Sequence, residues 1–157
     1  MRGQYSFSKD IQLGEFGESV VRDYMIFKKY QFIEKLTNYK YDLKMLYNNI
    51  AYTYEVKTDV YPVDTGNIVI EFECRDKPSG IAVTEADYFV TYFLHFGEIW
   101  NIRTDKLRYM INYFKPRIFE KAGDAGSNTR LYGFRKKEVE KFFKIHKNLP
   151  IYEEIEL

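Results

Sequence analysis

The spacing of apolar and polar residues predicts a helix near each end of a group of strands. Over residues 10–30, apolar residues recur at intervals of three and four, the period of a helix with one buried face. Gly14 and Gly17 lie in this segment and each disfavours a helix by up to about 1 kcal/mol relative to Ala, so another backbone is expected to approach there. A second helix is expected to begin near Thr104 and to end at Pro116.

The segments between these helices have the β-branched and aromatic composition of strands. Residues 39–47 and 50–58 flank Asn48-Asn49, a pair that tolerates the left-handed backbone of a tight turn. The two segments are therefore expected to form a hairpin. A third strand, over 67–74, is expected to extend the same sheet. Two further strands are expected around a turn at Gly97, over 88–96 and 98–103.

Two shorter helical features complete the expected order of elements. Thr84 and Asp87 have the spacing of a capping box, which predicts a short helical turn, and residues 135–145 predict a final short helix. The chain contains no internal repeat, low-complexity tract or interdomain linker. We expect one domain over 1–157, with a core at about 10–103 and a C-terminal helical extension at about 104–157.

Length and composition fit one intracellular domain. A chain of 157 residues is long enough to bury one core and too short for two. The 24 Lys and Arg residues nearly balance 23 Asp and Glu residues, so a nucleic-acid surface would have to come from local clustering. Cys74 is the only cysteine, which excludes an internal disulfide and is compatible with a reducing cytosol. Because the chain also lacks a long apolar run and a signal-peptide pattern, we expect a cytoplasmic protein without a membrane partner.

The chemistry of the chain centres on charged residues around the expected hairpin. Across a two-residue turn at 48 and 49, Asp42 lies opposite Glu55, since the two pairs of numbers have the same sum. Lys57 and Asp59 share the strand face of Glu55 because side chains alternate between faces. Two neighbouring carboxylates on a partly buried face repel each other, whereas a hard divalent cation turns the repulsion into attraction. The pattern therefore predicts a metal site.

Each residue of this site has an expected role. Asp42, Glu55 and the carbonyl oxygen of Val56 are expected to bind Mg²⁺ or Mn²⁺, and waters to complete the shell. A metal-bound water is acidic enough to act as a nucleophile, and Lys57 can orient it or neutralise charge on a phosphorane-like transition state. Glu18 on the first helix is expected to reach the same metal directly or through water, although Glu15 can exchange roles with it.

These residues resemble the signature of the PD-(D/E)xK nuclease superfamily, an Asp on one strand followed by Glu-x-Lys on the next. Here the signature is Asp42 with Glu55-Val56-Lys57, and Glu18 resembles the helix glutamate of Holliday junction resolvases and related phage nucleases. The residue before Asp42 is Tyr rather than Pro. The resemblance covers roughly the first hundred residues and implies an α/β (α+β) fold with a mixed sheet flanked by helices in the order αβββαβ. It also implies Mg²⁺ or Mn²⁺ and cleavage of DNA.

Contacts with nucleic acid are expected from two basic regions. The first follows the third strand and the second lies near the C-terminus, and the candidates are Arg75, Lys77, Ser79, Thr84, Arg130 and Lys136. Each region is equally compatible with an ordinary charged surface, as Glu55-x-Lys57 alone is compatible with a solvated ion pair.

Several other residues have a structural interpretation. Asp59 is expected to cap the end of its strand or to touch the metal, and Glu71 and Glu73 are expected to face solvent. His95 and His146 lack partners at the spacing of a zinc site. The chain contains neither a phosphate-binding GxxxxGK[ST] loop nor a GxSxG nucleophile elbow, so no nucleotide cofactor is expected.

The expected function is that of a metal-dependent DNA endonuclease, resolvase-like or otherwise acting on branched DNA. Symmetric cutting of two strands needs two active sites, which a homodimer supplies. One alternative is a restriction, repair or nicking nuclease of the same superfamily. Alternatives of another class are a catalytically silent nucleic-acid-binding module and a structural protein with surface ion pairs.

Overall fold

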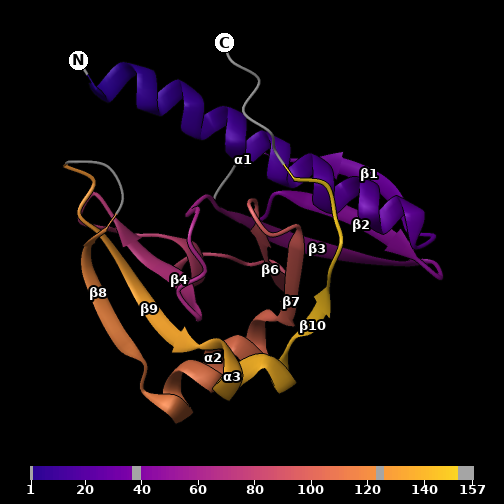
Figure 1. Ribbon diagram of the computed structural model, residues 1–157. Coiled ribbons are helices and arrows are strands. Elements are labelled where there is room, and N and C mark those ends of the chain that lie inside the picture. Colours follow the sequence, from indigo (N-terminus) through magenta and orange to yellow (C-terminus); the bar gives the residue numbers. More distant parts are fainter. Residues whose placement is uncertain (1, 37–39, 123–125, 152–157) are drawn as a thin grey trace.

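The computed structural model describes the backbone of residues 2–36, 40–122 and 126–151 and contains a long helix and two sheets (Figure 1). The helix is α1 (Arg2–Phe27). The larger sheet has six strands in the order β1-β2-β3-β6-β7-β10: Gln31–Lys35, Leu43–Tyr47, Ile50–Asp59, Tyr88–Phe93, Glu98–Arg103 and Lys144–His146. The smaller sheet has four strands in the order β5-β4-β9-β8: Lys77–Pro78, Asn67–Cys74, Thr129–Arg135 and Arg117–Ala122. The remaining helices are η1 (Gly80–Ala82), α2 (Thr104–Phe114), α3 (Lys136–Val139) and η2 (Glu140–Phe142).

Two apolar cores lie on the two faces of the six-stranded sheet. On one face, α1 packs Val20, Val21 and Met25 against strand residues such as Val56 and Val90. On the other face, the four-stranded sheet and α2 pack against the alternate residues of β6 and β7, and the cluster includes Ile68, Ile70, Phe89, Phe93, Trp100, Leu107 and Phe134. The molecule is therefore layered as helix, six-stranded sheet, and four-stranded sheet with α2, an α+β arrangement (Figure 1).

The hairpin prediction is confirmed. β2 and β3 are antiparallel with Leu43 opposite Tyr54, and Asn48 and Asn49 have φ angles of 50° and 64°. The predicted helix at the start of the chain is confirmed, as are α2 and the β6–β7 turn at Gly97, where φ is 61°.

The expected close approach to α1 occurs at one of its two glycines. A Cβ placed on Gly17 would lie 1.9 Å from the hydroxyl oxygen of Thr58, so α1 lies close to β3 here, although the group that it meets is a side chain and not the expected backbone. A Cβ on Gly14 would meet nothing within 4 Å, and the prediction is wrong there.

The third predicted strand does not extend the first sheet. β3 pairs with β6 in parallel, and β4 lies in the connection between them but belongs to the smaller sheet, where it pairs with β9. Ile68 and Ile70 of β4 are fully buried in the core between the sheets, which fixes β4 in that position. The first three strands of the six-stranded sheet are β1, β2 and β3 instead. β1 was not predicted, because its residues are mostly exposed and show no apolar alternation.

Two helical predictions are wrong in part. Thr84 and Asp87 do not cap a helix, since η1 ends at Ala82 and both side chains bond elsewhere. Over 135–145 the helical stretch ends at Phe142, and β10 follows as the edge strand of the six-stranded sheet. The predicted helical extension at 104–157 thus also contains β8, β9 and β10. Residue 39, the first of the predicted strand over 39–47, lies outside the described residues, as do 37, 38 and 123–125. No helix of the described residues is long and apolar enough to cross a membrane.

Candidate active site at the β2–β3 hairpin

Asp42 lies directly before β2, and the hairpin register brings it opposite Glu55 on β3. The backbone N–H of Asp42 donates to the carbonyl oxygen of Tyr54 at 2.9 Å, which continues the ladder by one residue. The side chain then accepts a hydrogen bond from the N–H of Val56, with 2.7 Å between Oδ2 and N. Asp42 is therefore held beside Glu55 by the backbone of both strands, as the numbering of the hairpin predicted.

Glu55 is buried, with 7% of its surface exposed, and each carboxylate oxygen has a partner. Oε1 lies 3.3 Å from Nζ of Lys57, and Oε2 lies 3.3 Å from the hydroxyl of Thr84. Burial raises the pKa of Glu55, while Lys57 and the hydrogen bond from Thr84 oppose that shift. These contacts hold the carboxylate in one orientation within a poorly solvated site.

Lys57 lies between two carboxylates from different sheets. Besides Glu55, it pairs with Glu71 of β4, with 3.8 Å between Nζ and Oε2. Although burial alone would lower the pKa of Lys57, the charges of Glu55 and Glu71 raise it above its ordinary value. Lys57 is therefore a permanent cation next to the Asp42–Glu55 pair.

Glu71 corrects the expectation that it and Glu73 face solvent together. Its side chain is only 26% exposed and points to Lys57, while Glu73 pairs with Arg130 at 3.6 Å. Nothing in the spacing of Glu71 marked it, because the contact depends on β4 lying in a second sheet across from β3.

The carboxyl of Asp42 is the most perturbed acid of the site. Burial raises its pKa from 3.8 to about 7, and the negative charges of Glu55 and Glu18 add to the shift. The hydrogen bond from Val56 and the charge of Lys57 oppose it without cancelling it. Asp42 thus repels its acidic neighbours at neutral pH unless a proton or another cation lies beside it.

Glu18 on α1 is close enough to influence Asp42, but its carboxylate has its own partner. Oε2 of Glu18 lies 2.9 Å from Nζ of Lys35 on β1. Its position follows from the close packing of the adjacent Gly17 on Thr58. Glu15 is solvent-exposed, whereas the charge of Glu18 raises the pKa of Asp42, so of the two helix glutamates Glu18 is the one that faces the site.

The residues present fit a hard divalent cation at Asp42 and Glu55. Carboxylate oxygens are the ligands that Mg²⁺ prefers, and the pKa of Asp42 is raised by burial and then by the charge of Glu55, both of which a bound cation would offset. Among the side chains that the structure describes, no three His, Cys, Asp or Glu are already gathered as a metal site. Glu18 would have to leave Lys35 to join, so Asp42 and Glu55 would hold the ion, with water or the Val56 carbonyl completing the shell.

Asp59 shares the strand face of Glu55 but does not join the cluster. Its carboxylate accepts a hydrogen bond from the N–H of Tyr61 at 2.9 Å, and the charges that act on it are Lys136 and His95. Asp59 therefore ends the strand, one of its two expected roles.

Some of the candidate nucleic-acid contacts are exposed to solvent, whereas others already form ion pairs within the protein. Arg75 in the β4–β5 turn and Lys77 at the start of β5 are exposed, and Ser79 is half-buried. Arg130 pairs with Glu73 and Glu120, the latter at 3.3 Å. Lys136 is 13% exposed, pairs with Asp64 at 3.3 Å and lies over the ring of Phe93.

Thr84 is the clearest correction among these contacts. It is 2% exposed and begins no helix, so it offers no surface to a phosphate. Its hydroxyl lies 3.1 Å from the carbonyl oxygen of Lys40, as well as against Glu55, and accepts from the N–H of Ala86. Thr84 therefore supports the buried carboxylate from behind.

Comparison with known proteins agrees with this architecture. No protein-family model matches the chain, and no curated protein matches it. Among solved structures, the chain is similar to a bacterial homing endonuclease, I-Ssp6803I, with a TM-score of 0.50 and 17% sequence identity. The match covers 60% of this chain and 69% of that chain. At this identity the similarity concerns the fold, and the chain has a restriction-endonuclease-like fold.

Proposed function

We propose that the protein is a metal-dependent endonuclease that hydrolyses phosphodiester bonds in DNA. The observation that carries the proposal is the cluster of Asp42, Glu55 and Lys57 on paired strands of a restriction-endonuclease-like fold. Two carboxylates that repel each other beside a lysine are costly in a merely structural role. They suit a site that binds a cation and an anionic substrate together.

Each residue of the cluster has a separate role in the proposed hydrolysis. Asp42 and Glu55 would hold the ion, which when bound polarises the phosphate and makes a water acidic. Lys57, kept protonated by Glu55 and Glu71, can donate hydrogen bonds to the scissile phosphate and stabilise the charge that grows in the transition state. Thr84 keeps Glu55 oriented, and the bond from Val56 keeps Asp42 oriented.

For the substrate we propose branched DNA, cut by a two-fold dimer in which each protomer cleaves one strand. The resolvase-like proposal rests on Glu18 of α1, which faces the strand carboxylates as the helix glutamate of such enzymes would. A second candidate is cleavage of linear duplex DNA, favoured by the similarity in fold to a homing endonuclease.

The test is a cleavage assay on four-way junction, flap, linear duplex and single-stranded DNA with Mg²⁺, Mn²⁺, Ca²⁺ or a chelator. We expect cutting with Mg²⁺ or Mn²⁺ only, and an at least 100-fold loss in Glu55→Gln with DNA binding retained. Glu73→Gln is the matched control, since it removes a carboxylate of β4 that pairs with Arg130 away from Lys57. Cleavage by Glu55→Gln at the rate of the wild type would disprove the assignment.

A further inference from the structure

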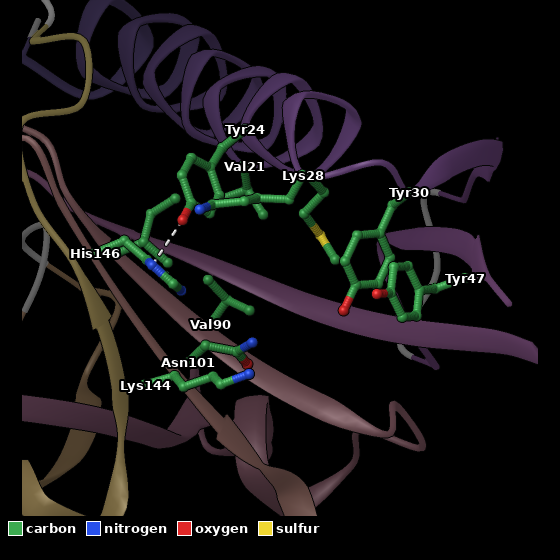
Figure 2. Close-up of a pocket in the computed structure, with 11 residues that line it drawn as sticks. Val21, Tyr24, Lys28, Tyr30, Tyr47, Val90, Asn101, Lys144 and His146 are labelled. Carbon is green, nitrogen blue, oxygen red and sulfur yellow. Dashed lines mark hydrogen bonds between the residues drawn. The ribbon is translucent and has the colours of Figure 1, made fainter.

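A pocket lies on the α1 face of the six-stranded sheet, between the C-terminal half of α1 and the edge formed by β7 and β10 (Figure 2). Its volume is about 330 Å³, within the range of small-molecule sites. Val21 and Met25 from α1 and Val90 and Ile99 from the sheet supply apolar walls and belong to the core beneath α1. Because Glu55 points to the opposite face of the sheet from its neighbour Val56, this pocket is separate from the candidate active site.

The charge of the pocket is positive. Lys28 of α1 and Lys144 of β10 line it, and the described residues that line it include no Asp or Glu. Neither lysine has an ion-pair partner in the described part of the chain, whereas most of the lysines discussed above have one. Burial, together with the charges of these two lysines, lowers the pKa of His146, which lies between them in the pocket wall. An anion would relieve this repulsion.

The polar groups of the pocket are aligned by the strands. Lys144 and His146 are the pairing partners of Asn101 and Ile99, so all four lie on one face. Nδ1 of His146 lies 2.7 Å from the hydroxyl of Tyr24, which fixes the imidazole ring. Oδ1 of Asn101 is buried and has no hydrogen-bond partner among the described residues. A buried acceptor left unpaired costs about 1–3 kcal/mol, so a ligand that brings a donor is favoured.

Aromatic rings form the far end of the pocket. Tyr30 and Tyr47 are stacked with 4.6 Å between their ring centroids, and Figure 2 shows both hydroxyls beside the space below α1. Tyrosine rings of this kind provide a flat apolar surface on which a planar ring can stack.

We propose that this pocket binds a nucleoside phosphate, with the phosphate near Lys28 and Lys144 and the base toward the tyrosines. The two lysines favour an anion, the tyrosines favour a planar ring, and the unpaired oxygen of Asn101 favours a hydrogen-bond donor. A free mononucleotide and a nucleotide at the end of a DNA strand share this chemistry. The proposal does not depend on the nuclease assignment.

Calorimetric titration without divalent metal tests it, with deoxyadenosine 5′-monophosphate, deoxyadenosine and inorganic phosphate as separate probes. We expect saturable binding of the nucleotide, and binding at least tenfold weaker for the nucleoside and for phosphate alone. The double variant Lys28→Gln/Lys144→Gln should weaken nucleotide binding at least tenfold, and Asn101→Leu severalfold. Lys137→Gln, an exposed lysine of α3 without an ion pair in the described residues, should leave it unchanged.

A competition experiment then distinguishes the two sources of the nucleotide. Competition by a 5′-phosphorylated oligonucleotide would assign the ligand to a DNA end, and its absence would assign it to a free nucleotide. No saturable nucleotide binding up to millimolar concentration, equal binding by the double variant, or equal binding of phosphate alone would overturn the proposal. Thermal unfolding of each variant checks that it is folded. Because Glu55→Gln is expected to bind the nucleotide normally, failure here and failure of the nuclease assignment are distinguishable.

Discussion

The two faces of the six-stranded sheet gather charges of opposite sign: carboxylates on one face and lysines on the other. On the face toward β4, the half-buried Asp42 lies beside the buried Glu55, and the pKa of Asp42 rises to about 7. On the face toward α1, Lys28 and Lys144 line one pocket whose other described lining residues include no carboxylate, and the pKa of His146 is lowered. A cation would relieve the first arrangement and an anion the second, and we therefore propose a binding site on each face, although the net charge of the chain is only +1.

The difference also lies in how much of each repulsion the protein itself compensates. The acidic face includes Lys57, which pairs with both Glu55 and Glu71. The described residues that line the pocket beneath α1 include no such counter-ion. The carboxylates around Lys57 are therefore partly neutralised by the protein itself, whereas the two exposed lysines of the pocket are not.

The largest expected effect comes from removing the cation of the acidic face. Lys57→Ala leaves Glu55 and Glu71 without their common partner and removes the donor proposed to contact the phosphate. We expect cleavage to fall by about a thousandfold, or roughly 4 kcal/mol of transition-state stabilisation, in single-turnover assays at saturating Mg²⁺. Lys137→Ala should cleave normally. A loss of less than tenfold in Lys57→Ala would remove Lys57 from the mechanism.

A second prediction concerns stability and its dependence on pH. An acid whose pKa is higher in the folded than in the unfolded state binds more protons when folded, so it lowers stability as pH rises through the window from about 4 to about 7. Asp42→Asn keeps an acceptor for the N–H of Val56 but loses the charge. We expect it to be inactive and yet more stable than the wild type at pH 8, by on the order of 2 kcal/mol.

Urea unfolding at pH 5 and pH 8 measures this prediction. The gain of Asp42→Asn should be smaller at pH 5, where the wild-type carboxyl is largely protonated. Added Mg²⁺ should stabilise the wild type more than the variant at pH 8, since the ion relieves the same repulsion. A variant that is less stable than the wild type at both pH values would show that Asp42 is not under electrostatic strain.

Local sequence predicted the pairing of the two strand carboxylates but not the position of β4. The pairing of Asp42 with Glu55 follows from turn length alone, because a two-residue hairpin fixes the register and alternation fixes the faces. The assignment of β4 to the same sheet failed because a strand pattern shows that a segment is extended but not which strand it pairs with. Glu71 was missed for that reason.

The remaining differences also arise from contacts between distant segments. The capping-box spacing of Thr84 and Asp87 was overridden because Thr84 bonds to Glu55 and Asp87 accepts from Thr53, across 29 and 34 residues of chain. Likewise, the pocket needs β10 to pair with β7, which places His146 beside Ile99. No periodicity within residues 135–145 indicates that pairing, so His146 looked isolated in the sequence.

Glu71→Gln tests whether the acidic face extends to the second sheet. Removing this charge leaves Lys57 with one ion-pair partner and weakens the constraint on its position. We expect a roughly tenfold drop in the cleavage rate with little change in DNA binding, since about 1.4 kcal/mol corresponds to tenfold. Glu73→Gln, two residues along the same strand, is the control and should cleave at the rate of the wild type. Equal rates for all three proteins would confine the site to β2 and β3.

The smallest expected effect lies in the basic pocket. His146 faces Tyr24 and Lys28 from α1 and neighbours Lys144 on its own strand, and both lysines lower its pKa. Removing one positive charge in Lys144→Gln should therefore raise the pKa of His146 by a few tenths of a unit at low salt, and added salt should reduce the difference by screening. Titration of the imidazole resonances by NMR measures this directly, with Lys137→Gln as control. An unchanged pKa would mean that solvent already screens Lys144, and the contrast between the two faces would then rest on Lys28 alone.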